Sequence, residues 1–245
     1  MGISEVRGYW EAAPCAAKLA VSEPGSKAFY SDIEAAKNRL EPHEAAFADF
    51  QKWSGRTVLE IGCGVGIDTA RFARAGADIT AIDLTEAAVS LANQLLELEG
   101  LPGEAVVANA EQLPFPDGRF DLVYSWGVLH HTPNIDQAMA EVHRVLKPGG
   151  QVRMMLYSRR STFAFAVWGR QVLRERRVMS MRDALSRGLE SPGTKAFTPA
   201  KATSLLRRFD GVRVKQVATR YDRQPFNPLG WHLLIQAQSQ FANPS

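Results

Sequence analysis

The chain has 245 residues, of which 45% are hydrophobic and 22% charged, and its formal net charge is +3. This length and composition suit a globular α/β protein with a sizeable core. No apolar run approaches the roughly 20 residues of a membrane-spanning helix, and two cysteines are too few for a disulfide framework. Because the N-terminus also lacks an apolar signal core, we predict a cytoplasmic protein without a membrane span.

The net charge conceals an uneven distribution. Residues 1–150 carry 12 Lys and Arg against 21 Asp and Glu, whereas residues 151–245 carry 17 against 5. The basic part could bind an anionic substrate, a membrane surface or nucleic acid. We favour the alternative interpretation, in which the basic part is a solvated face that pairs with the acidic half.

Residues 1–54 precede the first predicted strand, and we expect them to form a helical extension that acts as a lid. The pattern identifies helices only from residue 27 onward, where apolar side chains recur near helical spacing and Pro42 is placed to open a second helix. The segment is too short to bury a core of its own. We therefore expect one domain at residues 55–245.

From residue 57 onward, strands and helices alternate. This rhythm predicts parallel strands joined by right-handed crossovers, hence a doubly wound, mostly parallel seven-stranded sheet of the α/β class. An Arg-rich stretch at 159–196 breaks the rhythm and is predicted to be a helical insert after strand five. The expected strands are 57–61, 78–83, 105–108, 120–125, 152–157, 212–219 and 231–237, and the expected helices outside the insert are 68–75, 86–98, 135–146 and 199–209.

A glycine-rich turn follows the first strand, with Gly62, Gly64 and Gly66 alternating before a helix start. Such a turn lets a ligand approach bare backbone, and the following helix directs free N–H groups toward an anionic group. A dinucleotide-binding fingerprint would need its third glycine at position 67, where this chain has Ile67. Asp83 ends the second strand, where a carboxylate can accept hydrogen bonds from both ribose hydroxyls. Alternatively, Asp83 could cap the predicted helix that starts at residue 86, although Thr85 could provide that cap instead.

Five segments in this order resemble the motifs of class I S-adenosylmethionine-dependent methyltransferases, in the branch that contains the ubiquinone/menaquinone methyltransferases and many natural-product enzymes. They are residues 60–66 (Glu-Ile-Gly-Cys-Gly-Val-Gly), Asp83, and residues 109–115, 128–133 and 144–150. The resemblance implies a Rossmann-like fold and S-adenosyl-L-methionine as cofactor. The cofactor-binding residues that we predict are Glu60, Gly62, Cys63, Gly64, Gly66, Asp83, Leu84, Asn109, Ala110, Glu111 and Ser125, with Tyr30 and Arg39 as further candidates, Arg39 for the cofactor's carboxylate.

One departure from the family pattern concerns the loop that lies against adenine. The family usually presents Asp before Ala, whereas this chain has Asn109. An Asn side chain can still accept a hydrogen bond from the adenine amino group through its oxygen. The missing charge is expected to weaken cofactor binding.

Methyl transfer from a sulfonium needs in-line positioning and, for some acceptors, a base. His130 matches the position of the catalytic histidine in plant small-molecule O-methyltransferases and is the candidate base; the alternative is that it only fixes the strand–helix turn. Aromatic and histidine side chains are candidates to line the acceptor site, although each could be plain core. They are Tyr9, Trp10, Trp126, His131 and Tyr157. No Cys, His or acidic spacing predicts a metal site.

We therefore predict an S-adenosylmethionine-dependent methyltransferase that acts on oxygen or nitrogen of a small organic acceptor, with the N-terminal helices and the 159–196 insert closing over it. One alternative is an RNA methyltransferase that uses the basic C-terminal part, but scattered arginines without interleaved aromatics disfavour it. A second is a non-catalytic cofactor-binding protein on the same fold, and a third is a dehydrogenase. The acceptor and the oligomeric state cannot be deduced from the sequence.

Overall fold

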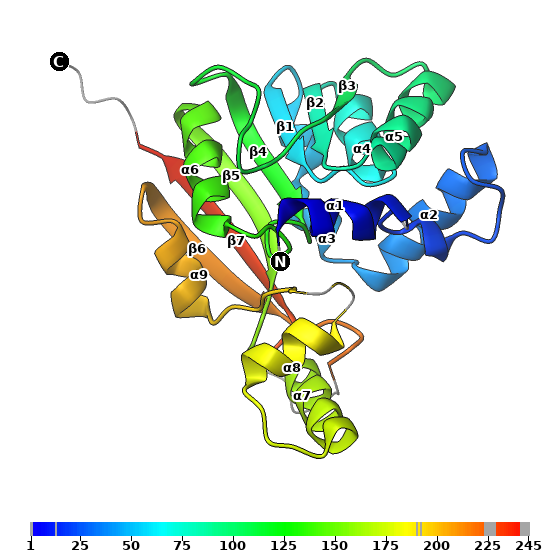
Figure 1. The fold of residues 1–245 in the computed structure, drawn as a ribbon. Helices are drawn as coiled ribbons and strands as arrows, with labels where there is room; N and C mark the ends of the chain where they lie inside the picture. The colour runs from blue at the N-terminus through cyan, green and yellow to red at the C-terminus, as the bar shows by residue number, and fades with distance from the viewer. Residues whose placement is uncertain (1, 13, 190, 192, 223–228, 241–245) are drawn as a thin grey trace.

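The alternating strands build a single seven-stranded sheet in the order β3-β2-β1-β4-β5-β7-β6 (Figure 1). The computed structural model describes residues 2–12, 14–189, 191, 193–222 and 229–240. The first five strands pair in parallel, and β7 runs antiparallel to both β5 and β6. The predicted mostly parallel sheet is thus confirmed. The strands are β1 (Thr57–Ile61), β2 (Asp78–Asp83), β3 (Glu104–Val107), β4 (Phe120–Trp126), β5 (Leu146–Tyr157), β6 (Phe209–Val217) and β7 (His232–Ser239).

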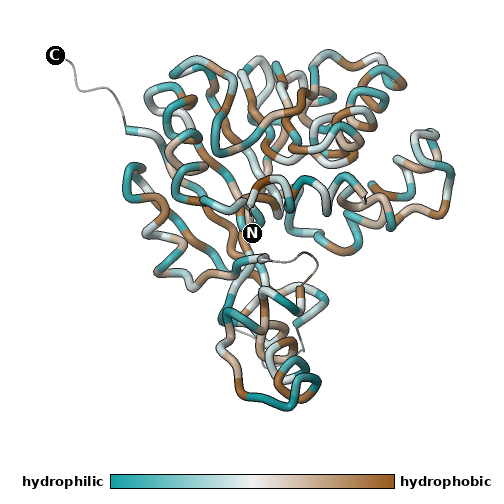
Figure 2. The backbone as a smooth tube through the Cα atoms, in the orientation of Figure 1, coloured by the Kyte–Doolittle hydropathy of each residue, from teal (hydrophilic) through white to brown (hydrophobic). Residues whose placement is uncertain are grey.

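Helices cover both faces of the sheet, so the strands in its middle are apolar on both sides. Along β1, Leu59 and Ile61 belong to one core layer with residues of α6 and α9, whereas Val58 belongs to the other layer with Phe72 of α4. Figure 2 shows the apolar residues concentrated along the strands in the middle of the molecule. The helices are α1 (Ile3–Ala12), α2 (Lys27–Leu40), α3 (Glu44–Ala48), α4 (Ile67–Arg74), α5 (Glu86–Glu99), α6 (Ile135–Val145), α7 (Thr162–Glu175), α8 (Met181–Gly188) and α9 (Pro199–Leu205), with short 3-10 turns at Ala17–Leu19 and Phe50–Trp53.

Helices are added to the sheet in the two segments for which the sequence predicted a helical extension and a helical insert, residues 1–54 and 159–196. The N-terminal helices α1 and α2 contact α5, and α7 and α8 form the insert after β5, which projects from one end of the sheet in Figure 1. Within the described part of the chain, no helix combines the length and apolarity that a membrane crossing requires.

The largest differences from the prediction lie at the start of β5, at the junction of α9 with β6, and in α1, while the other predicted bounds agree to within two residues. Strand β5 starts at Leu146 instead of 152, because Leu146 already pairs with Phe120 across a register shift. Helix α9 ends at Leu205 instead of 209, because Phe209 pairs with Ser239 and starts β6. Helix α1 had no predicted counterpart, since Val6 is its one buried residue and its apolar pattern is therefore weak.

Candidate functional site

A cavity of about 550 Å³ opens at the carboxyl ends of the parallel strands. Ligands bind at this edge in doubly wound sheets, because the loops after each strand converge there. The wall includes the glycine turn after β1, the end of β2, the loop after β3 and the ends of β4 and β5. Side chains of α1, α2 and the α7–α8 insert complete it. The cavity therefore joins the motif-bearing edge of the sheet to both additions.

The glycine turn is fixed by close packing as much as by its backbone conformation. Gly62 has φ of 82°, and a Cβ at that position would lie 2.2 Å from Cγ2 of Val128. Gly66 has φ of 88°, and its Cβ would lie 2.7 Å from Cα of Ala92 in α5. Both positions therefore exclude side chains. Gly62 and Gly64 line the cavity, whereas Gly66 lets α4 start close against α5.

Asp83 ties the glycine turn to the end of β2. One carboxylate oxygen accepts from the backbone N–H of Gly64 at 3.1 Å. The other accepts from the backbone N–H and the hydroxyl of Thr85, at 3.0 and 2.8 Å. Burial raises the pKa of Asp83, while these hydrogen bonds oppose the shift. Thr85 makes no side-chain cap on α5. Asp83 thus presents a positioned acceptor to the cavity.

The loop after β3 carries Asn109, whose side-chain oxygen accepts from the backbone N–H of Glu111 at 2.9 Å. This hydrogen bond closes a tight Asx turn that holds Ala108 and Ala110 at the cavity wall. An aspartate at this position would keep the turn acceptor and replace the amide NH₂ by a second oxygen.

We expect Asn109→Asp to bind S-adenosylmethionine at least as tightly as the wild type, because the added oxygen can accept from an adenine amino group. Isothermal titration calorimetry measures the two dissociation constants. Clearly weaker binding by the variant, with an unchanged melting midpoint, would contradict this role of position 109.

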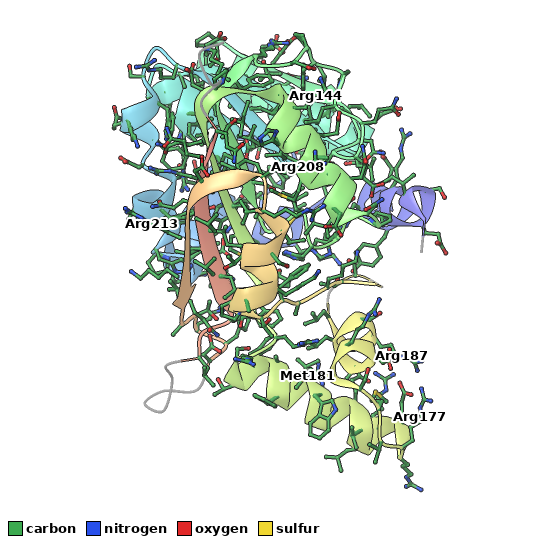
Figure 3. The ribbon with its side chains drawn as sticks, turned by 90° about the vertical axis from the view of Figure 1, so that its left-hand side faces the viewer. Arg144, Arg177, Met181, Arg187, Arg208 and Arg213 are labelled. Carbon is green, nitrogen blue, oxygen red and sulfur yellow. The ribbon has the colours of Figure 1, made fainter. Side chains whose placement is uncertain are left out.

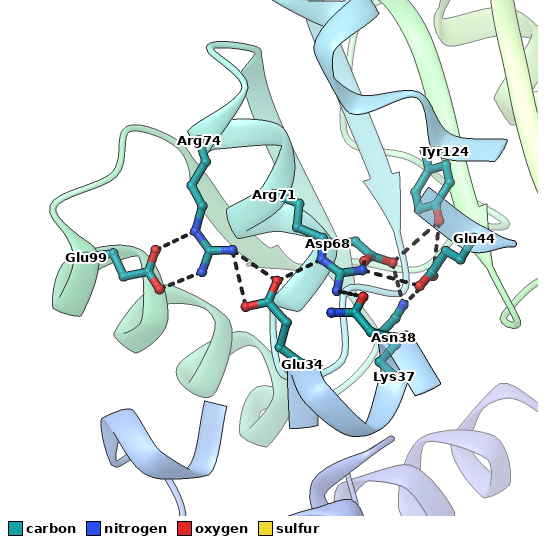
Figure 4. Close-up of polar contacts among 9 residues, drawn as sticks. All are labelled: Glu34, Lys37, Asn38, Glu44, Asp68, Arg71, Arg74, Glu99 and Tyr124. Atoms are coloured by element: carbon teal, nitrogen blue, oxygen red, sulfur yellow. Dashed lines mark hydrogen bonds and ion pairs between the residues drawn. The ribbon is translucent and has the colours of Figure 1, made fainter. Parts of the chain in front are cut away.

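A buried ion cluster lies beside the glycine turn and is shown in Figure 4. Lys37 of α2 donates to both Glu44 of α3 and Asp68 of α4, and the distance to Asp68 is 2.6 Å. Arg71 donates to the same two carboxylates, at 3.4 and 3.2 Å, and the Tyr124 hydroxyl donates to Glu44 at 3.3 Å. Burial lowers the pKa of Lys37, but the carboxylates of Asp68 and Glu44 outweigh it and raise the pKa overall. Lys37 and Asp68 also line the cavity.

Glu60 lies next to this cluster and accepts a hydrogen bond from the Thr69 hydroxyl. Burial, together with the Asp68 carboxylate, raises the pKa of Glu60 from 4.5 to about 8. At neutral pH the folded protein therefore holds Glu60 mainly protonated, whereas the unfolded chain ionises it.

This shift gives a pH prediction. A raised carboxyl pKa means that the folded state binds the proton more tightly, so the free energy of unfolding falls as pH rises from about 4.5 to about 8. Glu60→Gln removes this titration and should gain stability relative to the wild type across that window. Urea unfolding at a series of pH values tests it. Parallel pH curves for the two proteins would refute the assignment.

The far end of the cavity is aromatic. Trp126 ends β4, Tyr157 ends β5, and Trp231 stacks on Tyr157 with ring centroids 4.5 Å apart. His232 begins β7 opposite Tyr157 in the antiparallel pair. These flat side chains suit a planar or largely apolar acceptor.

A polar chain crosses this aromatic end. The Trp126 indole donates to Glu41 at 2.9 Å, and the other Glu41 oxygen lies 3.9 Å from Nε2 of His232. Nδ1 of His232 lies 3.0 Å from Nε2 of His43. Burial, and secondarily His43, lowers the pKa of His232 from 6.5 to about 3, so its imidazole is neutral at physiological pH. Glu41 and His232 line the cavity.

Helix α1 closes over the cavity with Ile3, Val6 and Trp10. Its last turn is fastened to α5, because the Glu11 carboxylate accepts from the backbone N–H groups of Glu86 and Ala87 at 3.1 and 3.0 Å. A carboxylate at a helix N-terminus satisfies unpaired donors and interacts favourably with the helix dipole. Glu11 therefore performs the capping that Thr85 does not.

We expect Glu11→Ala to loosen this lid and to weaken cofactor binding by about threefold to tenfold, the range that follows from losing a helix cap. Calorimetry measures the affinity for S-adenosylhomocysteine, and stopped-flow measures its dissociation rate. We expect the weaker binding to result from faster dissociation. Glu5→Ala, an exposed change on the same helix, is the control and should bind like the wild type. Equal affinity in all three proteins would show that α1 does not retain the ligand.

The structure gathers most of the predicted site residues around the cavity. Predicted residues that line it are Glu60, Gly62, Cys63, Gly64, Asp83, Leu84, Asn109, Ala110, Trp10, Trp126, His131 and Tyr157. Their binding roles remain predictions. Three of the others are engaged elsewhere: Ser125 donates to the Ile61 carbonyl, Glu111 accepts from Thr132 and Asn134, and Tyr30 donates to the Leu91 carbonyl in α5.

Two further predicted residues, Arg39 and Tyr9, also lie off the cavity wall and are exposed. On α2 the cavity-facing positions are Ile33, Lys37 and Leu40. Arg39 lies two residues beyond Lys37, about 200° around the helix, and so points to solvent. Tyr9 precedes Trp10 on α1 and contacts it edge-on at 5.0 Å while Trp10 enters the cavity.

His130 does not line the cavity. Its side chain is fully buried, its ring lies 3.9 Å from that of Tyr157, and neither ring nitrogen has a hydrogen-bond partner among the described residues. Burial, with His131, holds its pKa well below 6.5. His130 thus supports Tyr157 from behind, whereas His131 faces the cavity and meets Trp10 at 5.2 Å.

Residues that sequence reasoning did not single out are Lys37, Glu41, His43 and His232. Lys37 lies in α2, and Glu41 is the residue that follows its end. Their spacing of four residues is visible in the sequence, but it does not reveal which side of the helix faces the ligand. His43, just before α3, and His232, at the start of β7, are 189 positions apart, and only the tertiary fold brings them together. Among the described residues, no group of three or more His, Cys, Asp or Glu side chains could hold a metal ion.

Comparison with known proteins agrees with this geometry. A family model described as a methyltransferase domain matches residues 59–154. The ubiquinone biosynthesis O-methyltransferase of Pseudomonas paraeruginosa is 35% identical over 125 residues, which cover 49% of this chain and 53% of that protein. The ubiquinone/menaquinone biosynthesis C-methyltransferase UbiE of Psychromonas ingrahamii is 36% identical over 109 residues, covering 42% and 43%. The chain thus spans about half the length of these relatives, or less.

Solved structures share the fold over a longer stretch. A SAM-dependent methyltransferase from Methanosarcina mazei superposes with a TM-score of 0.60 at 24% identity, covering 80% of this chain and 98% of that one. The [4+2]-cyclase SpnF superposes with a TM-score of 0.64 at 16% identity, covering 99% and 98%. At these identities the likeness shows the fold alone, and the cyclase illustrates that one fold hosts different reactions.

Proposed function

We propose that this chain transfers a methyl group to an oxygen or nitrogen of a small organic molecule. Its domain at residues 59–154 belongs to the class I S-adenosylmethionine-dependent methyltransferases of the quinone-methyltransferase-like branch. The observation that carries the proposal is the cavity of about 550 Å³, which joins the motif residues to an aromatic chamber. We further propose that the reaction takes place in a reducing cytoplasm, in keeping with two free cysteines.

The polar groups of the cavity fit the cofactor. Asp83 offers an acceptor for the ribose hydroxyls, and the side-chain oxygen of Asn109 offers one for the adenine amino group, while Leu84, Ala108 and Ala110 offer an apolar wall. Beside the glycine turn, Lys37 can pair with the carboxylate of the amino-acid tail, and Glu60 and Asp68 can face its ammonium group. When bound, S-adenosylmethionine supplies the electrophilic methyl group.

The protein's own contribution is positioning. Aligning nucleophile and methyl group can be worth roughly 7–11 kcal/mol when the geometry is ideal. Trp126, Tyr157 and Trp231 would hold a flat acceptor, such as the aromatic rings that quinone-type substrates contain, and α1 and the insert would exclude water. We propose that Glu41, oriented by Trp126 and backed by His232, receives the acceptor's proton where one must be lost.

The first test is calorimetry and thermal shift with S-adenosylmethionine, S-adenosylhomocysteine and NADH, because a ligand of the native state raises apparent stability. Binding of the first two, without NADH, supports the proposal. Binding of NADH alone would revive the dehydrogenase.

The second test screens phenols, hydroquinones and amines for homocysteine release after S-adenosylhomocysteine hydrolysis. Turnover supports a methyltransferase, and Glu41→Gln should then lower kcat while leaving cofactor affinity unchanged. Tight cofactor binding with no turnover on any acceptor, RNA included, would favour a non-catalytic binding protein.

A further inference from the structure

The α7–α8 insert exposes an unusual set of large apolar side chains. Phe165 is 51% exposed, Leu173 is 79% exposed, and Val178, just beyond α7, is 89% exposed. Single exposed apolar residues are normal. Three on one short helical hairpin are more than packing explains, because the opposite side of α7 already buries Ala164 and Val167 against Leu185 of α8.

Arginines surround these apolar side chains. Residues 159–188 contain eight arginines and two acidic residues. Glu175 pairs with Arg177 and Arg187, and Asp183 accepts from Ser180 at the start of α8. Arg170, Arg174 and Arg176 are exposed, and within the described ranges none of them has an ion-pair partner. The insert therefore carries an uncompensated positive charge.

Helical spacing brings the two features onto one surface. Arg170, Leu173 and Arg174 lie at i, i+3 and i+4, so they share one side of α7. Arg176, Arg177 and Val178 follow directly after the end of that helix at Glu175. Figures 1 and 3 show that α7 and α8 project away from the sheet, and Arg177 is labelled near the tip of the pair in Figure 3. We name the surface formed by Phe165, Arg170, Leu173, Arg174, Arg176, Arg177 and Val178 the insert face.

We propose that the insert face docks the protein onto an anionic membrane surface. Arginines in this position can pair with lipid phosphates, while Leu173 and Val178 reach the boundary between headgroups and acyl chains. This combination distinguishes an interfacial surface from a merely solvated basic one, which would not present aliphatic side chains. The proposal concerns binding alone and stands independently of the proposed methyl transfer.

Two other occupants fit the insert face less well. Single-stranded nucleic acid is bound by interleaved aromatic side chains that stack on bases, whereas the most exposed apolar residues here are aliphatic. A second copy of the chain would bring like-charged arginines together across a two-fold interface. The inner side of the same insert lines the cavity through Phe163, Gly188 and Leu189, so docking would bring the cavity close to the lipid surface.

The test is sedimentation of the 245-residue chain with phosphatidylcholine vesicles, with and without an equal part of phosphatidylglycerol. We expect binding to the anionic vesicles and little binding to the neutral ones, with release at high salt. Arg170→Gln/Arg174→Gln/Arg176→Gln should weaken binding by at least about tenfold. Leu173→Ser/Val178→Ser, which changes no charge, should also weaken it.

A charge-matched control is Lys201→Gln/Arg208→Gln/Arg213→Gln. These cations are exposed on α9, just beyond it and on β6, and Figure 3 shows Arg208 and Arg213 on the sheet-bearing part of the molecule. The control should keep wild-type binding to anionic vesicles. Because all the substituted residues are exposed, each variant should keep the wild-type melting midpoint and S-adenosylhomocysteine affinity, which reports folding separately from docking.

Four results would overturn the proposal. One is a wild-type protein that does not sediment with anionic vesicles. Another is equal loss in the control variant, which would indicate attraction by net charge alone. Unchanged binding by Leu173→Ser/Val178→Ser would show that no apolar side chain enters the interface. A dimer seen by light scattering and lost in that variant would identify a second copy as the occupant.

Discussion

Replacing Lys37 by methionine is expected to destabilise the protein by about 3–5 kcal/mol, the cost of leaving buried charges without their partner. Lys37 donates to Glu44 and Asp68, whose side chains are only 2% and 3% exposed. Removing the ammonium group leaves two close carboxylates with Arg71 as their remaining cation in the buried ion cluster (Figure 4). Burial and the Asp68 carboxylate already raise the pKa of Glu44. Without Lys37, the Glu44 carboxylate would therefore take up a proton, and hydrogen bonds that the cluster makes to its charged form would be weakened.

Urea unfolding measures this effect, and a double-mutant cycle assigns its cause. Lys37→Met/Glu44→Gln should recover at least about 1 kcal/mol of the loss, because the second change removes one of the two repelling carboxylates. Arg39→Met, an exposed change on the same helix, should leave stability unaltered and serves as the control. If Lys37→Met cost no more than Arg39→Met, the cluster would be energetically unimportant.

The sheet could be predicted because its strands carry their own signal. Strands β1 and β2 have the bounds that their apolar runs predicted, since both faces are buried and no side-chain alternation confuses the pattern. The start of β5 could not be predicted, because 147–150 has a turn composition and its pairing with β4 depends on a neighbour 26 residues away. Helix α1 escaped prediction because its contacts are distant in sequence, such as that of Glu11 with the N-terminus of α5, which spans 75 positions.

The cofactor end of the site could be located because its residues are consecutive in short motifs. A glycine turn, Asp83 and Asn109 each follow a strand of the parallel sheet, so their convergence follows from topology. The acceptor end could not be located in this way. It depends on the rotation of α2, which turns Lys37 inward and Arg39 outward, and on the antiparallel strand β7, which brings His232 beside Tyr157. Motif position favoured His130, but three-dimensional packing buries it behind the wall.

The second large effect is expected at Asp83. Asp83→Asn should weaken binding of S-adenosylmethionine by about tenfold to a hundredfold, because hydrogen bonds to a charged acceptor contribute about 1.5–3 kcal/mol. The amide has one acceptor oxygen where the carboxylate has two. Either the Gly64 N–H, which lies 3.1 Å from one carboxylate oxygen, or the Thr85 donors, which bind the other, would then face an NH₂ group, and the ribose hydroxyls would lose an acceptor on that side. Calorimetry with S-adenosylhomocysteine gives the affinity without turnover.

A second ligand separates the loss of the contact between Asp83 and the ribose from a general distortion of the cavity by the substitution. The 2′-deoxy analogue of S-adenosylhomocysteine should bind the wild type more weakly than the parent compound. Asp83→Asn should distinguish the two ligands much less, because the 2′-hydroxyl of the parent compound has already lost its acceptor in the variant. Asp78→Asn, at the exposed start of the same strand, should bind like the wild type. If Asp83→Asn discriminated between the two ligands as strongly as the wild type, Asp83 would serve only to hold Gly64 and Thr85 in place, and the ribose would be recognised by another group of the cavity.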